Sequence, residues 1–203
     1  MRVRLAIKHP PAEGGAGLRN IRERVGPFLP EEPGFLHGWW MQDASGEAVS
    51  VTVWNDHDVA AHEAALRAVP GLPDIDASLI RQPDARHVLD LEASLGLEEA
   101  GGVLARVAWF DPGEPAAEPG WVEGHLVPAL AGVDGFLTLV LARDVESSRI
   151  VSLTLWGSEA ALRSGQDAVT ARADAAGLPL PRPGSVEVFR VWHEVRPGNA
   201  SFR

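Results

Sequence analysis

The sequence contains no cysteine and no tyrosine among its 203 residues. Without cysteine the chain has no disulfide, no thiolate nucleophile and no thiolate ligand for zinc or an iron–sulfur cluster. Without tyrosine, any mechanism that needs a phenol side chain is excluded. A metal ion would need His, Asp or Glu ligands, but no two histidines have the spacing of a metal-binding motif. The sequence therefore predicts no metal site.

The chain also lacks an excess of basic residues and any long apolar run. It has 28 acidic against 18 basic side chains, and its formal net charge is -10. A charge of this sign repels phosphate groups, so we expect no nucleic-acid partner. No run of 18 apolar residues occurs, and the N-terminal stretch lacks an apolar region of signal-peptide length. These features predict a cytoplasmic protein that does not enter a membrane.

One strand-like segment occurs twice in the sequence, with small changes. VSVTVW at 49–54 returns as VSLTLW at 151–156, and GFL at 34–36 returns at 135–137. The two GFL motifs are 101 residues apart and the two strands 102 apart, so one residue is inserted between them in the second copy. Helical periodicity precedes each GFL, and an Ala-rich helical stretch follows each repeated strand. Each copy is therefore predicted to be a βαββαβ unit, the ferredoxin-like order.

The repeat predicts two domains. We expect an N-terminal ferredoxin-like domain over 1–95, a linker over 96–102, a C-terminal ferredoxin-like domain over 103–197 and a tail over 198–203. The strand GFLHGWWMQD is apolar on both faces, and the helices of one copy can cover only one of them. The fold class is thus α+β, with two antiparallel sheets that pack as a pseudo-twofold α/β barrel. This intramolecular pseudo-dimer could pair further as a homodimer.

Strict alternation in the repeated strand assigns its two faces. Side chains of a strand point alternately to opposite sides, so the valines share one face and the polar residues and tryptophan the other. We expect the Val and Leu face to pack under the helices, and the Ser, Thr and Trp face to line the barrel interior. In the preceding strand, the same alternation groups Phe35, His37, Trp39 and Met41 on one face.

The stretch WGSEAALRSGQDAV, together with the preceding GFLTLVLARD, resembles the dimeric α/β-barrel superfamily that includes the antibiotic-biosynthesis-monooxygenase type. The resemblance covers nearly the whole chain and is strongest in 135–195. It implies two four-stranded antiparallel sheets and an apolar cavity. Oxygenases of this type act on electron-rich aromatic compounds such as anthrones without a cofactor. The resemblance therefore implies a small hydrophobic or aromatic partner and no cofactor.

Two histidines are the candidate catalytic residues. His62 falls on the apolar face of the helix predicted after the first repeated strand, where it could accept a proton or act as an axial haem ligand. His37 could join it across a pocket. The alternative is that each is a buried structural histidine. The second copy has Thr138 and Ser164 at these places, so any such site is confined to the N-terminal half.

The candidate substrate-binding residues lie on the strands expected to face the interior. They are Ser50, Thr52, Trp54, Trp39, Thr154 and Trp156. The alternative is that the repeated tryptophans serve packing, as large aromatic side chains usually do.

Three functions remain open on these residues. The first is an enzyme, namely a cofactor-independent monooxygenase or related small-molecule enzyme, with His62 as proton acceptor. The second is a non-catalytic protein that binds a hydrophobic ligand or acts as a scaffold. The third is haem binding through His62. It is weakened because haem-degrading members of the superfamily use an Asn, Trp and His set, and residues 2–9 contain no Asn.

Overall fold

The computed structural model describes residues 1–8, 23, 26–27, 29–55, 85–98, 101–114 and 119–197. The chain divides into two compact units. The first unit is Met1–Leu89 together with Val191–Arg203, and the second unit is Asp90–Arg190. No helix in the described part of the chain is long and apolar enough to cross a membrane.

The first unit is built on a sheet in which β3 lies between β1 and β2 and is antiparallel to both. Two strands, β4 and β8, each begin in one unit and end in the other; their bounds are given in the following list. The elements of the first unit are β1 (Arg2–Lys8), η2 (Leu29–Glu31), β2 (Phe35–Gln42), β3 (Ala48–Trp54), the start of β4 (Ala85–Leu95) and the end of β8 (Ser185–Val195).

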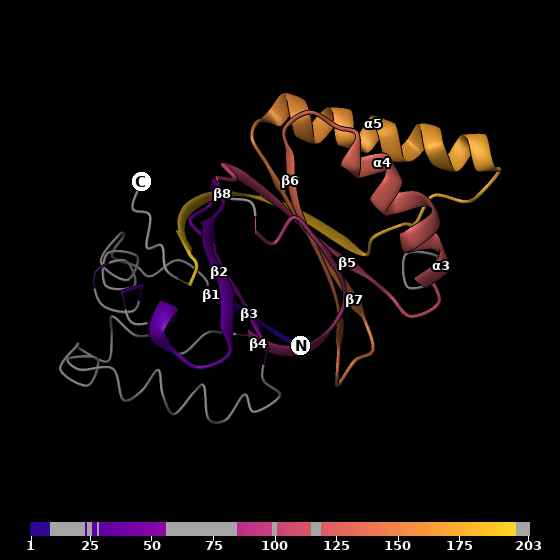
Figure 1. Ribbon diagram of the computed structural model, residues 1–203. Helices are drawn as coiled ribbons and strands as arrows, with labels where there is room; N and C mark the ends of the chain where they lie inside the picture. The colour runs from indigo at the N-terminus through magenta and orange to yellow at the C-terminus, as the bar shows by residue number, and fades with distance from the viewer. Residues whose placement is uncertain are drawn as a thin grey trace. The chain divides into compact units, whose positions relative to one another are not determined.

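The second unit repeats this order, with β7 between β5 and β6 and antiparallel to both, and with β8 paired to β5. Figure 1 shows its helices gathered on one side of its sheet. The elements are β5 (Leu104–Phe110), α3 (Pro119–Trp121), the π-helical η4 (Val122–Leu126), α4 (Val127–Ala131), β6 (Phe136–Asp144), β7 (Ile150–Trp156) and α5 (Glu159–Ala176).

The strands are hydrogen-bonded in the order β1-β3-β2-β8-β5-β7-β6-β4, and each pairs with two others, which is the strand order of a closed barrel. The predicted α+β class and ferredoxin-like topology are confirmed. The strand β4 begins at Ala85 and ends at Leu95. The pairing of the repeated strands is also equivalent, since Trp54 lies opposite Phe35, and Trp156 lies opposite Phe136.

Helix α5 has clear local start and stop signals. Ser158 is its N-cap, and the Ser158 hydroxyl oxygen accepts a hydrogen bond from the backbone N–H of Ala161 at 3.1 Å. Gly177 ends the helix in the left-handed conformation with φ of 64°, which glycine adopts without steric cost. These two signals set the length of the helix that covers β6 and β7.

The helices of the second unit pack on the face of the repeated strand that carries its tryptophan. Trp156 is buried in one cluster with Leu130 of α4 and Leu162 of α5. The predicted orientation of this strand is therefore wrong, since the Ser, Thr and Trp face lies under the helices and the Val and Leu face is turned away from them. The physical reason is Gly165 of α5, whose missing side chain makes room for the indole.

The first unit has an equivalent aromatic cluster. Trp54 is buried with Leu29, Phe35, Trp40 and Val195. Phe35 meets Trp54 edge to face, with ring centroids 5.1 Å apart, as Phe136 meets Trp156 in the second unit at 5.3 Å.

A register shift in β2 separates two residues that simple alternation groups together. Phe35 lies opposite Trp54, and His37 lies opposite Val53, so one extra residue is accommodated between them. Phe35 therefore packs with Trp54 and Trp40, whereas His37 belongs to the other face. The expectation that Phe35 shares a face with His37 is wrong, because periodicity cannot reveal the shift.

The contact between Gly165 and Trp156 gives a stability prediction. A Cβ at Gly165 would clash with Cη2 of Trp156, and this indole is only 2% exposed and cannot turn away. Gly165→Ala should lower the free energy of unfolding by about 1–3 kcal/mol, measured by urea denaturation. The control is Gly120→Ala, because a Cβ there meets nothing within 4 Å and stability should be unchanged or higher. Equal stability of the two variants would contradict the close packing of α5.

Candidate functional site

The first unit carries a buried His–Glu pair on the sheet face opposite Trp54. His37 of β2 is 1% exposed, and its Nε2 lies 2.8 Å from Oε1 of Glu194 in β8. A carboxylate can only accept a hydrogen bond, so Nε2 of His37 is the donor. In the neutral imidazole this leaves the lone pair on Nδ1, the atom that can accept a proton.

Trp39 packs directly on this histidine. The two rings are stacked, with centroids 4.1 Å apart and planes 16° apart. Trp39 is fully buried, and its Nε1–H has no hydrogen-bond acceptor among the described residues. The same face of β2 thus carries an imidazole and an indole N–H on neighbouring side chains.

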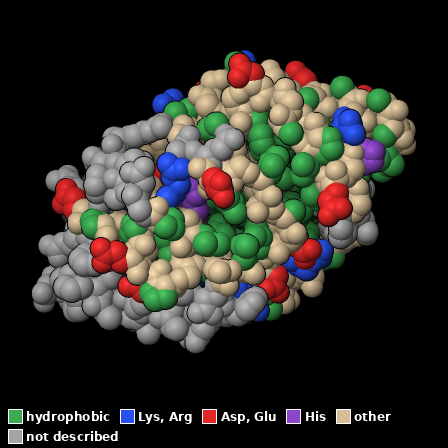
Figure 2. Space-filling model, in the orientation of Figure 1, with side chains coloured by type: hydrophobic (Ala, Val, Ile, Leu, Met, Phe, Trp, Pro, Cys, Tyr) green, Lys and Arg blue, Asp and Glu red, His purple; other side chains and the backbone are tan. Residues whose placement is uncertain are grey.

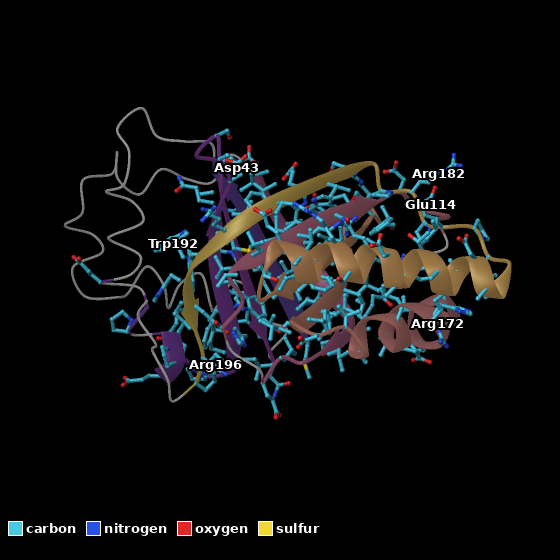
Figure 3. All side chains as sticks on the ribbon, turned by 90° about the horizontal axis from the view of Figure 1, so that it is seen from above. Asp43, Glu114, Arg172, Arg182, Trp192 and Arg196 are labelled. Carbon is cyan, nitrogen blue, oxygen red and sulfur yellow. The ribbon has the colours of Figure 1, made fainter. Side chains whose placement is uncertain are left out.

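A basic side chain lies near the carboxylate of the pair. Nε of Arg196 is 3.9 Å from Oε1 of Glu194, and the Glu194 side chain is 10% exposed. Figure 3 shows Arg196 just beyond the end of β8. A buried carboxylate is costly unless it is paired, and here it has both His37 and Arg196 as compensating groups.

The end of β8 that carries Glu194 contacts aromatic side chains on its other face. His193 is buried beside Trp40, with ring centroids 5.5 Å apart, and its ring stacks on that of Trp192 at 5.7 Å. Trp192 is labelled on β8 in Figure 3. The consecutive residues His193 and Glu194 therefore contact opposite faces of β2, because Trp40 and His37 lie on opposite faces.

The second unit has no such pair at the equivalent place. Thr138 occupies the position of His37, and its hydroxyl donates to the backbone oxygen of Gly96 at 2.9 Å. Val140 occupies the position of Trp39, two residues further along β6. The histidine and the tryptophan of the first unit are thus replaced in the second by a threonine and a valine.

The sequence-predicted residues separate into two groups. The rings of His37 and Trp39 stack on each other. The two Trp–Thr pairs lie on the other face of the sheet in their own unit, and in each pair the two side chains are hydrogen-bonded to each other. In each pair the indole N–H donates to the threonine hydroxyl at 2.9 Å, Trp54 to Thr52 and Trp156 to Thr154. The prediction that Trp156 and Thr154 line the interior is wrong, because they lie under α4 and α5.

Two further candidates have other outcomes. Ser50 is half-buried and lies opposite Trp40 in the strand register, on the same face as Thr52. His62 lies outside the described residues, and its predicted roles as proton acceptor and haem ligand stay predictions.

Sequence reasoning missed Glu194. It follows His37 by 157 residues, so no local spacing connects the two. The available signal was the polar pair His193–Glu194 within the otherwise apolar end of a strand, RVWHEV, because an acidic residue in such a position needs a partner.

The described residues contain no group of three or more His, Asp or Glu placed to hold a metal ion. Burial lowers the pKa of Arg106. Desolvation alone would raise the pKa of Asp43, but hydrogen bonds from Ser45 and the backbone of its turn lower it overall. On the face shown in Figure 2, acidic and basic side chains of the described residues are interspersed.

Comparison with known proteins identifies the fold. No protein-family model and no curated protein matches the chain. Among solved structures, a candidate monooxygenase of Fusobacterium nucleatum is similar over 100% of this chain and 97% of its own, with a TM-score of 0.69 and 10% identity. An anthrone oxidase-like protein is similar over 99% of this chain and 95% of its own, with a TM-score of 0.57 and 15% identity.

A third similar solved structure is described by the name of the family that the sequence resembles. It is a ferredoxin-fold protein of Listeria monocytogenes related to antibiotic-biosynthesis monooxygenases, similar over 93% of this chain and 94% of its own, with a TM-score of 0.52 and 9% identity. The chain therefore has the ferredoxin-like fold of these solved structures. Similarity at these identities defines the fold alone.

The Trp–Thr bonds predict a structural role that can be measured. Thr154→Val keeps the side-chain shape and removes the acceptor of a buried indole N–H, which should lower the free energy of unfolding by about 1–3 kcal/mol. Thr52→Val should cost a similar amount. Thr170→Val is the control, since this threonine is exposed on α5 and its loss should change stability by less than about 0.5 kcal/mol. Denaturation curves that coincide for all three would contradict this role.

Proposed function

We propose that the chain is a small-molecule oxygenase that works without a cofactor on an aromatic compound with an acidic C–H bond. The observation that carries the proposal is the buried pair of His37 and Glu194 in the first unit, at 2.8 Å. Buried acid–base pairs of this kind occur at catalytic sites. The monooxygenase-type fold supports the same reading at a coarser level.

The reaction begins with proton transfer. Nδ1 of His37 accepts a proton from the activated C–H bond, and the electron pair of that bond becomes a carbanion delocalised over the aromatic system. The carbanion reduces O₂, the oxidant of the reaction, and a new C–O bond forms. Loss of water from the resulting hydroperoxide gives the ketone, so that R₂CH₂ and O₂ become R₂C=O and H₂O.

Glu194 acts as a positioning residue. By accepting the Nε2–H bond, it fixes the ring orientation and the tautomer in which Nδ1 carries the lone pair. When His37 takes up that proton, the negative carboxylate stabilises the imidazolium that forms.

The aromatic surroundings favour a flat, apolar substrate. Trp39 is stacked on His37, and the name of one structural neighbour, an anthrone oxidase-like protein, suggests the same substrate class. A small hydrophobic or aromatic molecule is accordingly the proposed partner.

His37→Gln tests the proposal, because glutamine can still donate a hydrogen bond to Glu194 but cannot accept a proton in the same way. We expect kcat with an anthrone-type substrate to fall by about 100- to 10,000-fold, measured as O₂ consumption. Thr138→Val is the matched control, since Thr138 is the equivalent residue of the second unit. It should retain the parent kcat.

Two outcomes would contradict the oxygenase proposal. Parent-like turnover by His37→Gln would exclude His37 as the proton acceptor. A parent protein that binds the aromatic compound but consumes no O₂ would instead support a non-catalytic ligand-binding protein.

Glu194→Gln tests the positioning role. The amide can bond His37 without supplying a negative charge, so kcat should lie between those of the parent and His37→Gln while KM stays close to that of the parent. Steady-state kinetics on all three proteins measures this split. A KM effect with unchanged kcat would show that Glu194 shapes the binding site and does not support proton transfer.

A further inference from the structure

Arg106 of the second unit is a half-buried cation without a counter-ion among the described residues. It lies on β5, opposite Thr154 of β7 and Val188 of β8, so its side chain is on the sheet face that the helices pack against. Its Nε is buried and has no hydrogen-bond acceptor in the described part of the chain. Burial alone accounts for the lowered pKa of this guanidinium, with no carboxylate to offset it.

Such a cation needs an explanation. A charge that is partly removed from water is costly unless an anion or an acceptor compensates it. Acidic groups are not scarce in this chain, which has 28 of them against 18 basic ones. The arginine at the equivalent place in the first unit is Arg4, opposite Thr52, and it has an interaction partner. Of this repeated pair, the arginine of the second unit is thus the one that lacks a partner.

Strand β8 exposes an apolar strip beside Arg106. Val188, opposite Arg106, is 45% exposed, and Val186, opposite Ala108, is 43% exposed. Opposite residues of an antiparallel pair point to the same side, so both valines share the face of Arg106. Two residues apart on a strand, they offer apolar contact over about 7 Å. The helices that cover Trp156 therefore leave this part of the face open, with a cation and an apolar strip side by side.

The positive charge lies at one end of the strip. Arg190 follows Val188 by two residues on the same face and is exposed. Arg106 and Arg190 thus flank Val188, whereas Val186 lies further from both. A ligand that fits this surface has an anionic group at one end and an apolar chain at the other.

We infer that Arg106, Val186 and Val188 form a binding site for a small monocarboxylate with an aliphatic chain. The carboxylate supplies the missing counter-charge and accepts hydrogen bonds from the terminal nitrogens of the guanidinium. The chain lies along the two valines and removes their surface from water. A monoanion suits a half-buried cation better than a phosphate dianion, because it loses less hydration on binding. The site belongs to the second unit and uses no residue of the proposed oxygenase centre.

Octanoate and octanamide test the ligand class, because they share the alkyl chain and differ in charge. We expect octanoate to bind about 10- to 100-fold more tightly, as for hydrogen bonds to a charged group. An amide-resolved NMR titration measures both affinities and should show shifts at the backbone amides of Val186 and Val188. Equal affinities, or shifts that spare both valines, would overturn the inference.

Arg106→Met tests the cation, because it keeps an unbranched side chain and removes the charge. Octanoate affinity should fall about 10- to 100-fold, and octanamide affinity should stay the same. Arg163→Met is the matched control, since this exposed arginine of α5 pairs with Glu159 and its loss removes the same charge from the same unit. It should bind octanoate like the parent.

Two further variants keep the test decisive. If Arg106→Met does not fold, Arg106→Lys takes its place, and its octanoate affinity should be intermediate, because an ammonium group cannot form two parallel hydrogen bonds. Val188→Thr keeps the side-chain shape and should weaken octanoate and octanamide alike.

The outcomes are separate from those of the proposed function. Parent-like octanoate affinity in both Arg106 variants, or an equal loss in Arg163→Met, would overturn the carboxylate site. None of these measurements depends on O₂ consumption, so the turnover of His37→Gln tests the oxygenase proposal independently.

Discussion

The register shift between Phe35 and His37 is the constraint on which the candidate site depends. Regular alternation would place both side chains on one face of β2. With the shift, Phe35 packs edge to face on Trp54, and His37 turns to the opposite face and meets Glu194. One inserted residue thus separates a packing aromatic from a polar group, without interrupting the strand as a whole.

The second unit has the same shift between Phe136 and Thr138, with a different chemical result. Thr138 donates to a backbone oxygen, whereas His37 bonds a side-chain carboxylate. The backbone geometry of the two units is therefore equivalent at this point, and the difference in chemistry comes from side chains alone. This pattern supports a division in which the first unit carries the proposed chemistry and the second does not.

The sequence predicts the strands and their order well because both depend on local periodicity and on the repeat. It names His37 and Trp39 among its candidate residues, and the stacking of their two rings is a contact that the sequence does not reveal. It misplaces Trp156, because period-2 alternation defines two faces without showing which one a helix covers. It misses Glu194, because that contact depends on how β8 pairs with β2, and pairing between distant strands leaves no local trace.

The strands β4 and β8, which begin in one unit and end in the other, affect the order in which the protein is completed during synthesis. All residues of the second unit, Asp90–Arg190, are made before the segment of β8 that completes the first unit. Domains usually fold from the N-terminal one onward. Here the first unit includes Glu194 and Val195, which are synthesised after the second unit, so the contact of His37 with Glu194 can form only once all residues of the second unit have been made.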